Sequence, residues 1–550
     1  LLLNIVFFSL LIVRSLYLAI FLFFFLPSTM NRVYLPVQNR SRLFFNAARL
    51  YASSSSSENV FSCIDFHLPN KNAFFNPTDG NHCSYYSFQS LVHRLGSWLR
   101  KDMQVDVGDR VCAQVPKSVF ALALCYASMK IGAIYVPVNT AHPNSVVKYL
   151  LEDARPKLLL VDDHSGETVV NVRGKQFANL TNVVGLRQAQ LQSSYHSADP
   201  YVLAVDSNHV AALCYTSGTT GRPKGAMITH GNLTSNAKTL AKMWCMNADD
   251  RLLHALPIYH VHGLFISLNA CLFAGGEAIL LDHYDCDQMA KAIPTANVFM
   301  GVPTYFTRLA KRGYCRADLW KSMRLLVSGS APLTEATWQE YARKADHQIL
   351  ERYGMTEGQV ICSNPYHGPR KPGTVGMALP GVEISIRQGV LHYRGENVCR
   401  GYWHDEEKTR TAFSEDGFFN SGDLASIDSD GYVTILGRSS DLIISGGLNV
   451  YPKEVELVLD SISGVEESAV VGVPHEDLGE AVIAVLVIDH GRKPITEEQV
   501  KQQLKPYLAN YKIPKRIIFV DQLPRNAMSK VEKNLLRERM KNIFVKNKSH

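Results

Sequence analysis

The central part of the chain alternates short apolar runs with stretches of helical periodicity. Apolar runs at 110–115, 133–138 and 157–162 predict strands, and the segments 119–131 and 145–153 between them predict helices. Such an alternation is typical of a parallel sheet that is covered by helices on both faces. The sequence therefore predicts an α/β fold in this region.

Further apolar runs at 298–302, 325–328 and 348–351 repeat the pattern, and each is followed by a polar or glycine-containing loop. In open α/β sheets, ligands bind beside the loops that follow the carboxyl ends of the strands. These loops are therefore candidate positions for a functional site.

The pattern changes in the last third of the chain. Short alternating runs with frequent turns between Val382 and Asp423 predict a small antiparallel β region. A polar break follows at Arg438–Asp441, and the segment beyond it has strand patterns of its own, such as those at 469–473 and 481–488. We place a domain boundary at this break.

The length of the chain supports this division, because 550 residues are too many to fold around one hydrophobic core. We expect an α/β architecture in which a large N-terminal domain of doubly wound sheets, with the small β region, spans residues 58–437. A hinge at 438–441 then leads into a small, mobile α+β domain at 442–550.

The first 57 residues differ from the rest. Leu1–Leu26 is almost wholly apolar and long enough for a membrane helix or a signal sequence. From Met30, the first methionine, the sequence is rich in Arg and Ser and free of acidic residues, which is typical of a mitochondrial transit peptide. We expect translation to begin at Met30, cleavage between Arg49 and Ser57, and a location in the mitochondrial matrix. A signal anchor is the competing interpretation.

The formal net charge of +7 is concentrated in this leader. The chain has 57 basic and 50 acidic side chains, and five arginines are the only charged residues before Glu58. Without these five, 52 basic side chains face 50 acidic ones, and no lysine-rich stripe is present. The composition disfavours nucleic-acid binding, and we expect no membrane association of the mature protein.

The eleven cysteines are scattered and form no C-x-x-C pair. This distribution disfavours both a disulfide framework and a zinc site, and it fits a reducing compartment or the mitochondrial matrix.

The segment Tyr215–Asn232, YTSGTTGRPKGAMITHGN, carries the strongest chemical signal. Its glycines let successive N–H groups point at one oxyanion, its hydroxyls add donors and its lysine supplies a cation. We predict a phosphate-binding loop, with a Thr/Ser-rich surface loop as the alternative. A Walker A loop is disfavoured because Gly225 follows Lys224. The candidate phosphate ligands are Thr216, Ser217, Gly218, Thr219, Thr220, Gly221 and Lys224.

Six further motifs follow along the chain. They are LPIYHVHG at 256–263, SGSAPL at 328–333, RYGMTEG at 352–358, SGD at 421–423, GRSSDLIISGG at 437–447 and PRNAMSK at 524–530. With these motifs, the chain from about residue 60 to 540 resembles the adenylate-forming superfamily of acyl-CoA synthetases, luciferases and adenylation domains. The resemblance implies that ATP activates a carboxylic acid, because AMP is a far better leaving group than oxide or hydroxide.

Adenylation requires charge control, because the attacking carboxylate and the triphosphate repel each other. The resemblance makes Glu357 the ligand of Mg²⁺, a hard cation that prefers oxygen donors. It places Thr356 at the α-phosphate, and Lys530 between the carboxylate and the α-phosphate.

The resemblance also implies a nucleotide site built from several segments. Tyr353 is expected against adenine and Arg438 at the ribose. Asp423 can accept hydrogen bonds from both ribose hydroxyls, because one carboxylate has two acceptor oxygens. The remaining implied nucleotide-binding residues are Gly329, Ala331 and Gly354.

In the second half-reaction, a thiol attacks the acyl-adenylate after the C-terminal domain of the superfamily has swung about its hinge. The glycine-rich loop that then lines the pantetheine tunnel corresponds here to Ser445, Gly446 and Gly447, since small residues suit a close approach of ligand to backbone. The hinge position is usually lysine or aspartate, and this chain has Ser440. We expect this departure to affect hinge kinetics rather than chemistry.

Within the superfamily, the motifs are most similar to those of malonyl-CoA synthetases, for example GVPTYFTRL at 301–309. A dicarboxylate needs a cation for its far carboxylate, because an unpaired buried charge is costly. The resemblance assigns Arg308 and Ser330 to that carboxylate and His260 to the wall near the reacting one. A solvent-facing Arg308 and a hydrogen-bonded core His260 are the alternatives.

The expected activity is therefore ligation of malonate to CoA with ATP and Mg²⁺, giving malonyl-CoA, AMP and pyrophosphate. A ligase for methylmalonate or a short monocarboxylate, and a nucleotide-binding protein without turnover, are the competing interpretations.

Overall fold

The computed structural model of the chain describes residues 58–64, 66–163, 177, 179–216, 223–489, 495–525 and 531–544. The chain separates into two units, 1–56 and 57–550. The expected leader, its start at Met30 and its cleavage site lie outside the described residues. Among the helices of the described ranges, none has both the length and the apolar character that crossing a bilayer requires.

The first sheet has six strands in the order β6-β5-β3-β4-β7-β8. All neighbouring strands are parallel except β8, which runs antiparallel to β7. The strands are β3 (Arg110–Gln114), β4 (Ile134–Pro137), β5 (Leu158–Val161), β6 (Asn182–Gly185), β7 (Val210–Thr216) and β8 (Lys224–Thr229). The three strands predicted between 110 and 162 are confirmed.

Four helices belong to this part of the chain, namely α3 (Tyr85–Lys101), α4 (Val119–Lys130), α5 (Asn144–Ala154) and α7 (Leu186–Ser194). The predicted helices at 119–131 and 145–153 correspond to α4 and α5. Helix α4 is buried from Phe120 to Lys130, so its sequence is apolar on all faces. The Ser118 side chain caps it by accepting a hydrogen bond from the amide of Ala121.

The second sheet has nine strands in the order β15-β14-β13-β12-β11-β9-β10-β1-β2. The run from β13 to β1 is parallel, and β2, β14 and β15 are antiparallel at the two edges. The parallel strands are β1 (Asn72–Asn76), β9 (Arg251–His254), β10 (Glu277–Leu280), β11 (Val298–Gly301), β12 (Leu325–Ser328) and β13 (Leu350–Tyr353). The edge strands are β2 (Asn81–Ser84), β14 (Cys362–Ser363) and β15 (Met377–Ala378).

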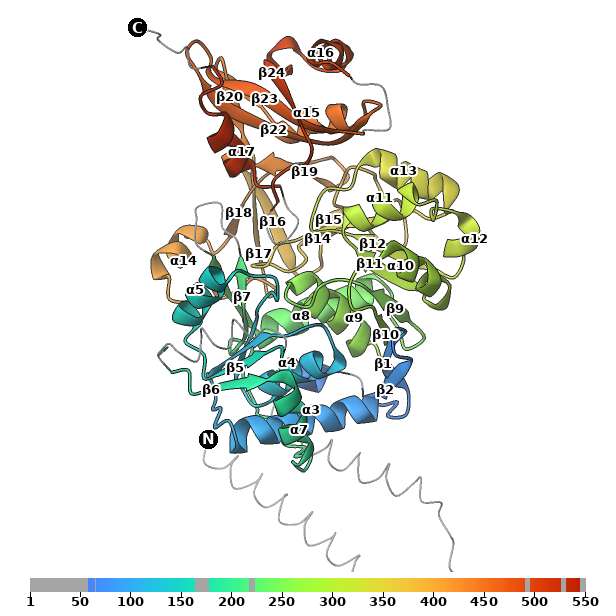
Figure 1. Cartoon of the computed structure of the whole chain (residues 1–550), viewed down its shortest axis with the longest axis vertical. Helices are drawn as coiled ribbons and strands as arrows, with labels where there is room; N and C mark the ends of the chain where they lie inside the picture. The colour runs from blue at the N-terminus through green and yellow to red at the C-terminus, as the bar shows by residue number, and fades with distance from the viewer. Residues whose placement is uncertain are drawn as a thin grey trace, which may run out of the picture. The chain divides into compact units, whose positions relative to one another are not determined.

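The three strands predicted from 298 onward are confirmed, although the third begins at Leu350 rather than at residue 348. Helices α10 (Cys286–Ala292), α11 (Pro303–Lys311), α12 (Ala317–Trp320) and α13 (Glu335–Lys344) lie beside β11 and β12 (Figure 1). One hydrophobic cluster joins these helices to the sheet through Phe299, Phe306, Trp320 and Tyr341.

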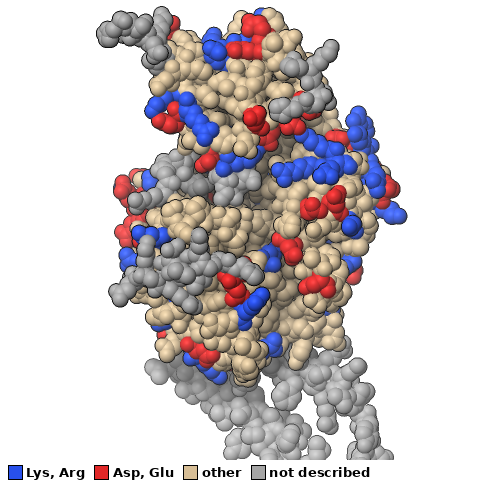
Figure 2. Space-filling view, in the orientation of Figure 1, with Lys and Arg blue, Asp and Glu red and all other residues tan. Residues whose placement is uncertain are grey.

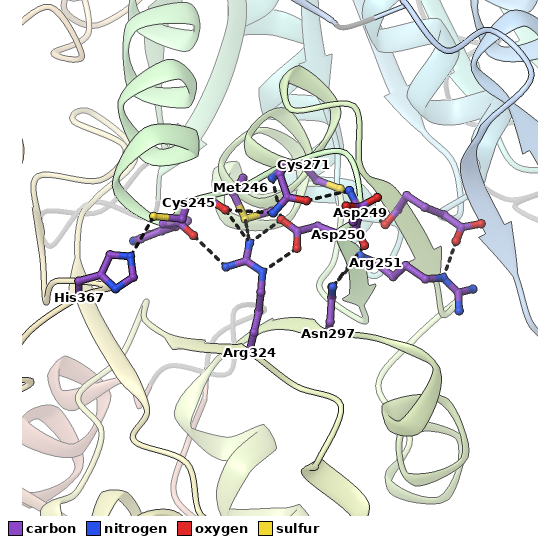
Figure 3. A network of polar contacts seen from close by, with 12 residues as sticks. Cys245, Met246, Asp249, Asp250, Arg251, Cys271, Asn297, Arg324 and His367 are labelled. Atoms are coloured by element: carbon purple, nitrogen blue, oxygen red, sulfur yellow. Dashed lines mark hydrogen bonds and ion pairs between the residues drawn. The ribbon is translucent and has the colours of Figure 1, made fainter.

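A buried ion pair fixes the start of this sheet. The carboxylate of Asp250, just before β9, has no exposed surface and lies 2.5 Å from Nη2 of Arg324, the residue before β12. Arg324 also donates hydrogen bonds to the carbonyl oxygens of Trp244 and Cys245, at 3.1 Å each. Figure 3 shows the Arg324 guanidinium between Asp250 and Cys245. Removing one partner of such a buried pair typically costs about 3–5 kcal/mol.

The predicted antiparallel region is confirmed as a four-stranded sheet in the order β16-β17-β18-β19. Its strands are β16 (Val382–Arg387), β17 (Val390–Gly395), β18 (Phe419–Ile427) and β19 (Val433–Arg438). β19 ends at Arg438, and the short 3-10 helix η4 (Ser439–Asp441) follows it.

A separate five-stranded sheet lies beyond η4, with its own hydrophobic clusters. Its strands are β20 (Ile443–Ser445), β21 (Leu448–Val450), β22 (Val465–His475), β23 (Gly479–Ile488) and β24 (Arg516–Val520), and its helices are α15 (Pro452–Asp460), α16 (Glu497–Leu504) and α17 (Lys533–Met540). The expected α/β fold, with a small α+β part at the C-terminal end, is therefore confirmed. The boundary at 438–441 stays a prediction that coincides with η4.

Acidic and basic side chains are interspersed on the face of the molecule shown in Figure 2. This mixture agrees with the near balance of charge beyond the leader. All eleven cysteines have free thiols.

Candidate active site

The phosphate loop connects two antiparallel strands. Thr216 ends β7 and pairs with Lys224, the first residue of β8, so the hairpin holds the two ends of the loop together. Ser217, Gly218, Thr219, Thr220 and Gly221 lie outside the described residues, and their phosphate contacts stay a prediction.

Lys224 is linked to Glu357 through an aromatic side chain that the sequence analysis did not identify. The ammonium of Lys224 lies 5.4 Å from the centre of the Tyr402 ring, and the Tyr402 hydroxyl donates a 2.8 Å hydrogen bond to Oε1 of Glu357. Tyr402 is positioned by a β-bridge to Ala226 of β8. Two motifs separated by more than a hundred residues therefore meet at this point.

Glu357 belongs to a tight turn after β13. A Cβ atom at Gly354 would lie 1.7 Å from the carbonyl oxygen of Gln359, so only glycine fits there. The Glu357 side chain is buried, at 5% exposure, and Thr356 beside it is partly buried.

A buried carboxylate with one hydrogen-bonded oxygen suits Mg²⁺, which binds through one or two carboxylates and completes its shell with substrate phosphates and water. The described residues contain no cluster of three or more His, Cys, Asp or Glu side chains that would form a protein-only metal site. A metal ion held by Glu357 would take its remaining ligands from nucleotide phosphates and water.

The residues expected at the ribose, Asp423 and Arg438, and the residue expected at adenine, Tyr353, come from three strands, and their nucleotide contacts stay predictions. Arg438, at the end of β19, is the register partner of Asp423 in β18, and its Nε lies 2.9 Å from Oδ1 of Asp423. Tyr353, at the end of β13, donates a hydrogen bond to Oδ2 of the same carboxylate. Burial, followed by the charge of Asp423, raises the pKa of Tyr353 well above its usual value, so this hydroxyl remains a donor. The structure brings these three predicted residues together.

The turn after β12 presents Ser330 in a left-handed backbone conformation, with φ of 69°. This conformation is uncommon outside glycine and is often found at functional sites. The Ser330 Oγ lies 3.1 Å from Nδ1 of His262, to which the sequence analysis gave no role. His262 begins the π-helix η2 (His262–Ser267), and such π-helical segments are frequent at functional sites.

The other predicted residues of the acid and nucleotide sites differ in how far they are buried. Gly329 is buried, Ala331 is exposed, and His260 is partly buried against the ring of Tyr259. Arg308 is exposed on α11. Its expected contact with a distal carboxylate stays a prediction.

The implied CoA loop is a tight turn between β20 and β21. Ser445 is buried and pairs with Leu448, and the two residues between them, Gly446 and Gly447, have φ of 59° and 75°. Two successive left-handed residues are typical of a type I′ turn, which favours glycine. The backbone conformation accounts for both glycines without a ligand, so the CoA contact stays a prediction.

The expected hinge is held by an ion pair. Nη2 of Arg537, on α17, lies 2.5 Å from Oδ1 of Asp441 and 3.5 Å from the carbonyl oxygen of Ser440. Lys530 lies outside the described residues. Its loop is bracketed by a β-bridge between Arg525 and Val531.

Comparison with known families agrees with a site of the adenylate-forming class. Residues 66–403 match the AMP-binding enzyme family, and residues 454–530 match the AMP-binding enzyme C-terminal domain. The first match alone covers more than half of the chain. The chain therefore belongs to the AMP-binding enzyme family, as an adenylate-forming acid–thiol ligase of the acyl-CoA synthetase type.

Similar proteins cover most of the chain. A malonate–CoA ligase of Arabidopsis thaliana is 31% identical over 91% of this chain and 92% of its own length. A mitochondrial malonate–CoA ligase of Xenopus laevis is 31% identical over 82% of this chain and 86% of its own length. The structure of ATP-bound MatB from Rhodopseudomonas palustris is 43% identical, covers 89% of this chain and 100% of that chain, and has a TM-score of 0.85.

The carboxylate of Asp423 provides a test of the ribose site. We expect Asp423→Asn to raise the KM for ATP by about tenfold, because one charge-assisted contact worth about 1.5–3 kcal/mol is weakened. The measurement is acid-dependent ATP–pyrophosphate exchange at varied ATP. A change confined to the KM for the acid would contradict this role.

Proposed function

We propose that this protein ligates malonate to CoA at the expense of ATP, through a malonyl-adenylate. The observation that carries the proposal is similarity over most of the chain to two malonate–CoA ligases, one of them 31% identical over 91% of this chain and 92% of its own length. The Tyr353–Asp423–Arg438 and Lys224–Tyr402–Glu357 contacts are consistent with it, because they gather groups suited to a ribose and to a triphosphate.

In the first half-reaction, a malonate oxygen forms a bond to the α-phosphorus of ATP while the bond to pyrophosphate breaks. Lys224 and the amides and hydroxyls of the 216–221 loop would hold the phosphates, and Lys530 would neutralise the attacking carboxylate and the α-phosphate. Glu357 would hold Mg²⁺, which when bound offsets phosphate charge as a Lewis acid. Tyr402 fixes the orientation of the Glu357 carboxylate through its hydrogen bond.

In the second half-reaction, the sulfur of CoA forms a bond to the acyl carbon, the thiol proton passes to solvent and AMP leaves with the bonding electrons of the C–O bond. The turn at Ser445–Gly447 would line the approach of the thiol. Ser330, oriented by His262, and Arg308 would contact the far carboxylate of malonate, which a cation and a hydroxyl can bind together.

A panel of acids tests the proposed substrate. We expect malonate to support ATP–pyrophosphate exchange with a kcat/KM at least about tenfold above that of acetate, propionate or butyrate, since about 1.4 kcal/mol of selective binding gives this factor. Methylmalonate belongs in the same panel. A preference for a monocarboxylate would favour the alternative ligase, and a folded protein without exchange on any acid would favour a nucleotide-binding protein.

Arg308 provides a test within the acid site. We expect Arg308→Ala to lower kcat/KM for malonate by about tenfold or more while changing that for butyrate by less than about threefold, because only malonate has a second charge to bind. Arg312→Ala, one turn further along the chain, is the matched control. Equal losses with both acids would remove the role assigned to Arg308.

We also propose that the segment from Met30 addresses the protein to mitochondria. The support is its Arg- and Ser-rich, acid-free composition, together with the similarity to a mitochondrial relative.

Import into isolated mitochondria tests this assignment. We expect the chain from Met30 to be imported and shortened near residues 49–57, and the chain from Glu58 to remain outside, because it lacks the basic segment. If both chains are imported equally, the segment is not the targeting signal.

A further inference from the structure

Arg352 is a buried cation without a carboxylate partner in the part of the chain that the structure describes. The residue is 4% exposed, and neither Nε nor Nη2 of its guanidinium has a hydrogen-bond partner among the described residues. Burial is the cause that lowers the pKa of Arg352 to about 9, so the group remains charged at neutral pH. The unfolded chain holds this proton more tightly, and the buried charge therefore costs folding free energy at neutral pH.

Few carboxyl side chains lie outside the described ranges as possible partners for this charge. The residues outside the described ranges contain only two carboxyl side chains, Asp65 and Glu167, and neither the 217–222 loop nor the 526–530 loop contains one. Arg324 shows the contrast, because its guanidinium is paired with the buried carboxylate of Asp250. Arg352 is therefore suited to bind an anion rather than to stabilise the fold.

Arg352 packs against the turn that carries Ser330. A Cβ atom added at Gly329 would lie 2.5 Å from both Cζ and Nε of Arg352, so the guanidinium is in contact with the backbone of this turn. The next residue is Ser330, whose hydroxyl contacts Nδ1 of His262.

The charge of Arg352 also affects the pKa of His262. Burial, and after it the charge of Arg352, lowers the pKa of His262 well below its usual value, with smaller contributions from His254 and His260. The imidazole is therefore neutral. In its Nδ1–H tautomer it donates to Ser330 Oγ, and the Ser330 proton is then available for a negatively charged group.

We propose that Arg352 is a specificity-determining residue. Its buried positive charge beneath the Gly329–Ser330 turn selects an acid that carries a second negative charge, and it maintains the His262–Ser330 pair in the orientation that presents the Ser330 hydroxyl to that charge. The inference rests on the proposed function, because it concerns the same acid site.

The test compares Arg352→Met, which removes the charge but keeps the apolar stem, with Arg352→Lys, which keeps the charge. We expect Arg352→Met to raise the KM for malonate by about tenfold or more with a smaller change in kcat, and to change the KM for butyrate by less than about threefold. Arg352→Lys should recover a substantial part of the malonate affinity. Both acids are measured by ATP–pyrophosphate exchange with the full chain.

Thermal unfolding separates this role from a structural one, and Arg324→Met is the matched control. We expect Arg352→Met to unfold at the same temperature as the original protein or at a higher one, because an unpaired buried charge has been removed. Arg324→Met should unfold at a clearly lower temperature, because it leaves Asp250 unpaired. If Arg352→Met is destabilised as strongly as Arg324→Met, the assignment is wrong.

The outcomes distinguish this inference from the proposed function. If the original protein does not prefer malonate, the proposed function fails before any variant is made, and the inference fails with it. If the original protein prefers malonate but Arg352→Met keeps the same ratio of malonate to butyrate KM values, only the inference is overturned. We expect the double variant Arg352→Met, Ser330→Ala to raise the KM for malonate by less than the product of the two single increases, because both residues act on the same carboxylate.

Discussion

The hydrogen bond between Tyr402 and Glu357 is the contact on which the rest of the site depends. Tyr402 is attached to the edge of the six-stranded sheet through Ala226, and Glu357 follows the last parallel strand of the nine-stranded sheet. A second link nearby, from the amide of Cys399 to the carbonyl oxygen of Glu357 at 2.7 Å, restricts the backbone of the same turn. These contacts link the two α/β sheets where the candidate site residues Lys224 and Glu357 lie, beside the hydrophobic cluster that the sheets share.

The candidate ribose site is likewise ordered by contacts within the protein. The carboxylate of Asp423 is already oriented by Arg438 and by Tyr353, and its own amide donates a 3.0 Å hydrogen bond to Ser421 Oγ. A bound ribose hydroxyl would share or replace the existing contacts of the Asp423 carboxylate with Arg438 and Tyr353. Such preorganisation lowers the entropic cost of binding, because the side chains are ordered before the nucleotide arrives.

Much of this architecture could be predicted because it depends on local patterns. The strands at 110–115 and 325–328 are short, mainly apolar segments that the parallel sheets bury almost completely, and the alternation of such segments with helical stretches identifies them. Tyr353, Asp423 and Arg438 could be grouped only through the family resemblance, since the contact of Asp423 with Arg438 requires the register of β18 and β19.

His262 and Arg352 lie within recognised motifs, but the motifs alone assigned neither residue a role. Tyr402 lies in a segment without a recognised motif, and its role depends on a single bridge to β8. The role proposed for Arg352 depends on the lack of a hydrogen-bond partner for its Nε and Nη2 among the described residues. A sequence shows which charges exist but not which of them the fold leaves unpaired.

At the turn of Gly446 and Gly447, the backbone conformation restricts the chirality of a residue and not the size of its side chain. A Cβ atom built at Gly447 meets no other atom within 4 Å, so space does not exclude a side chain there. The positive φ of 75° disfavours an L-residue instead, at a cost of about 1–2 kcal/mol. A D-alanine introduced by chemical ligation would adopt the same angle without strain. This position therefore discriminates between mirror-image residues of identical volume.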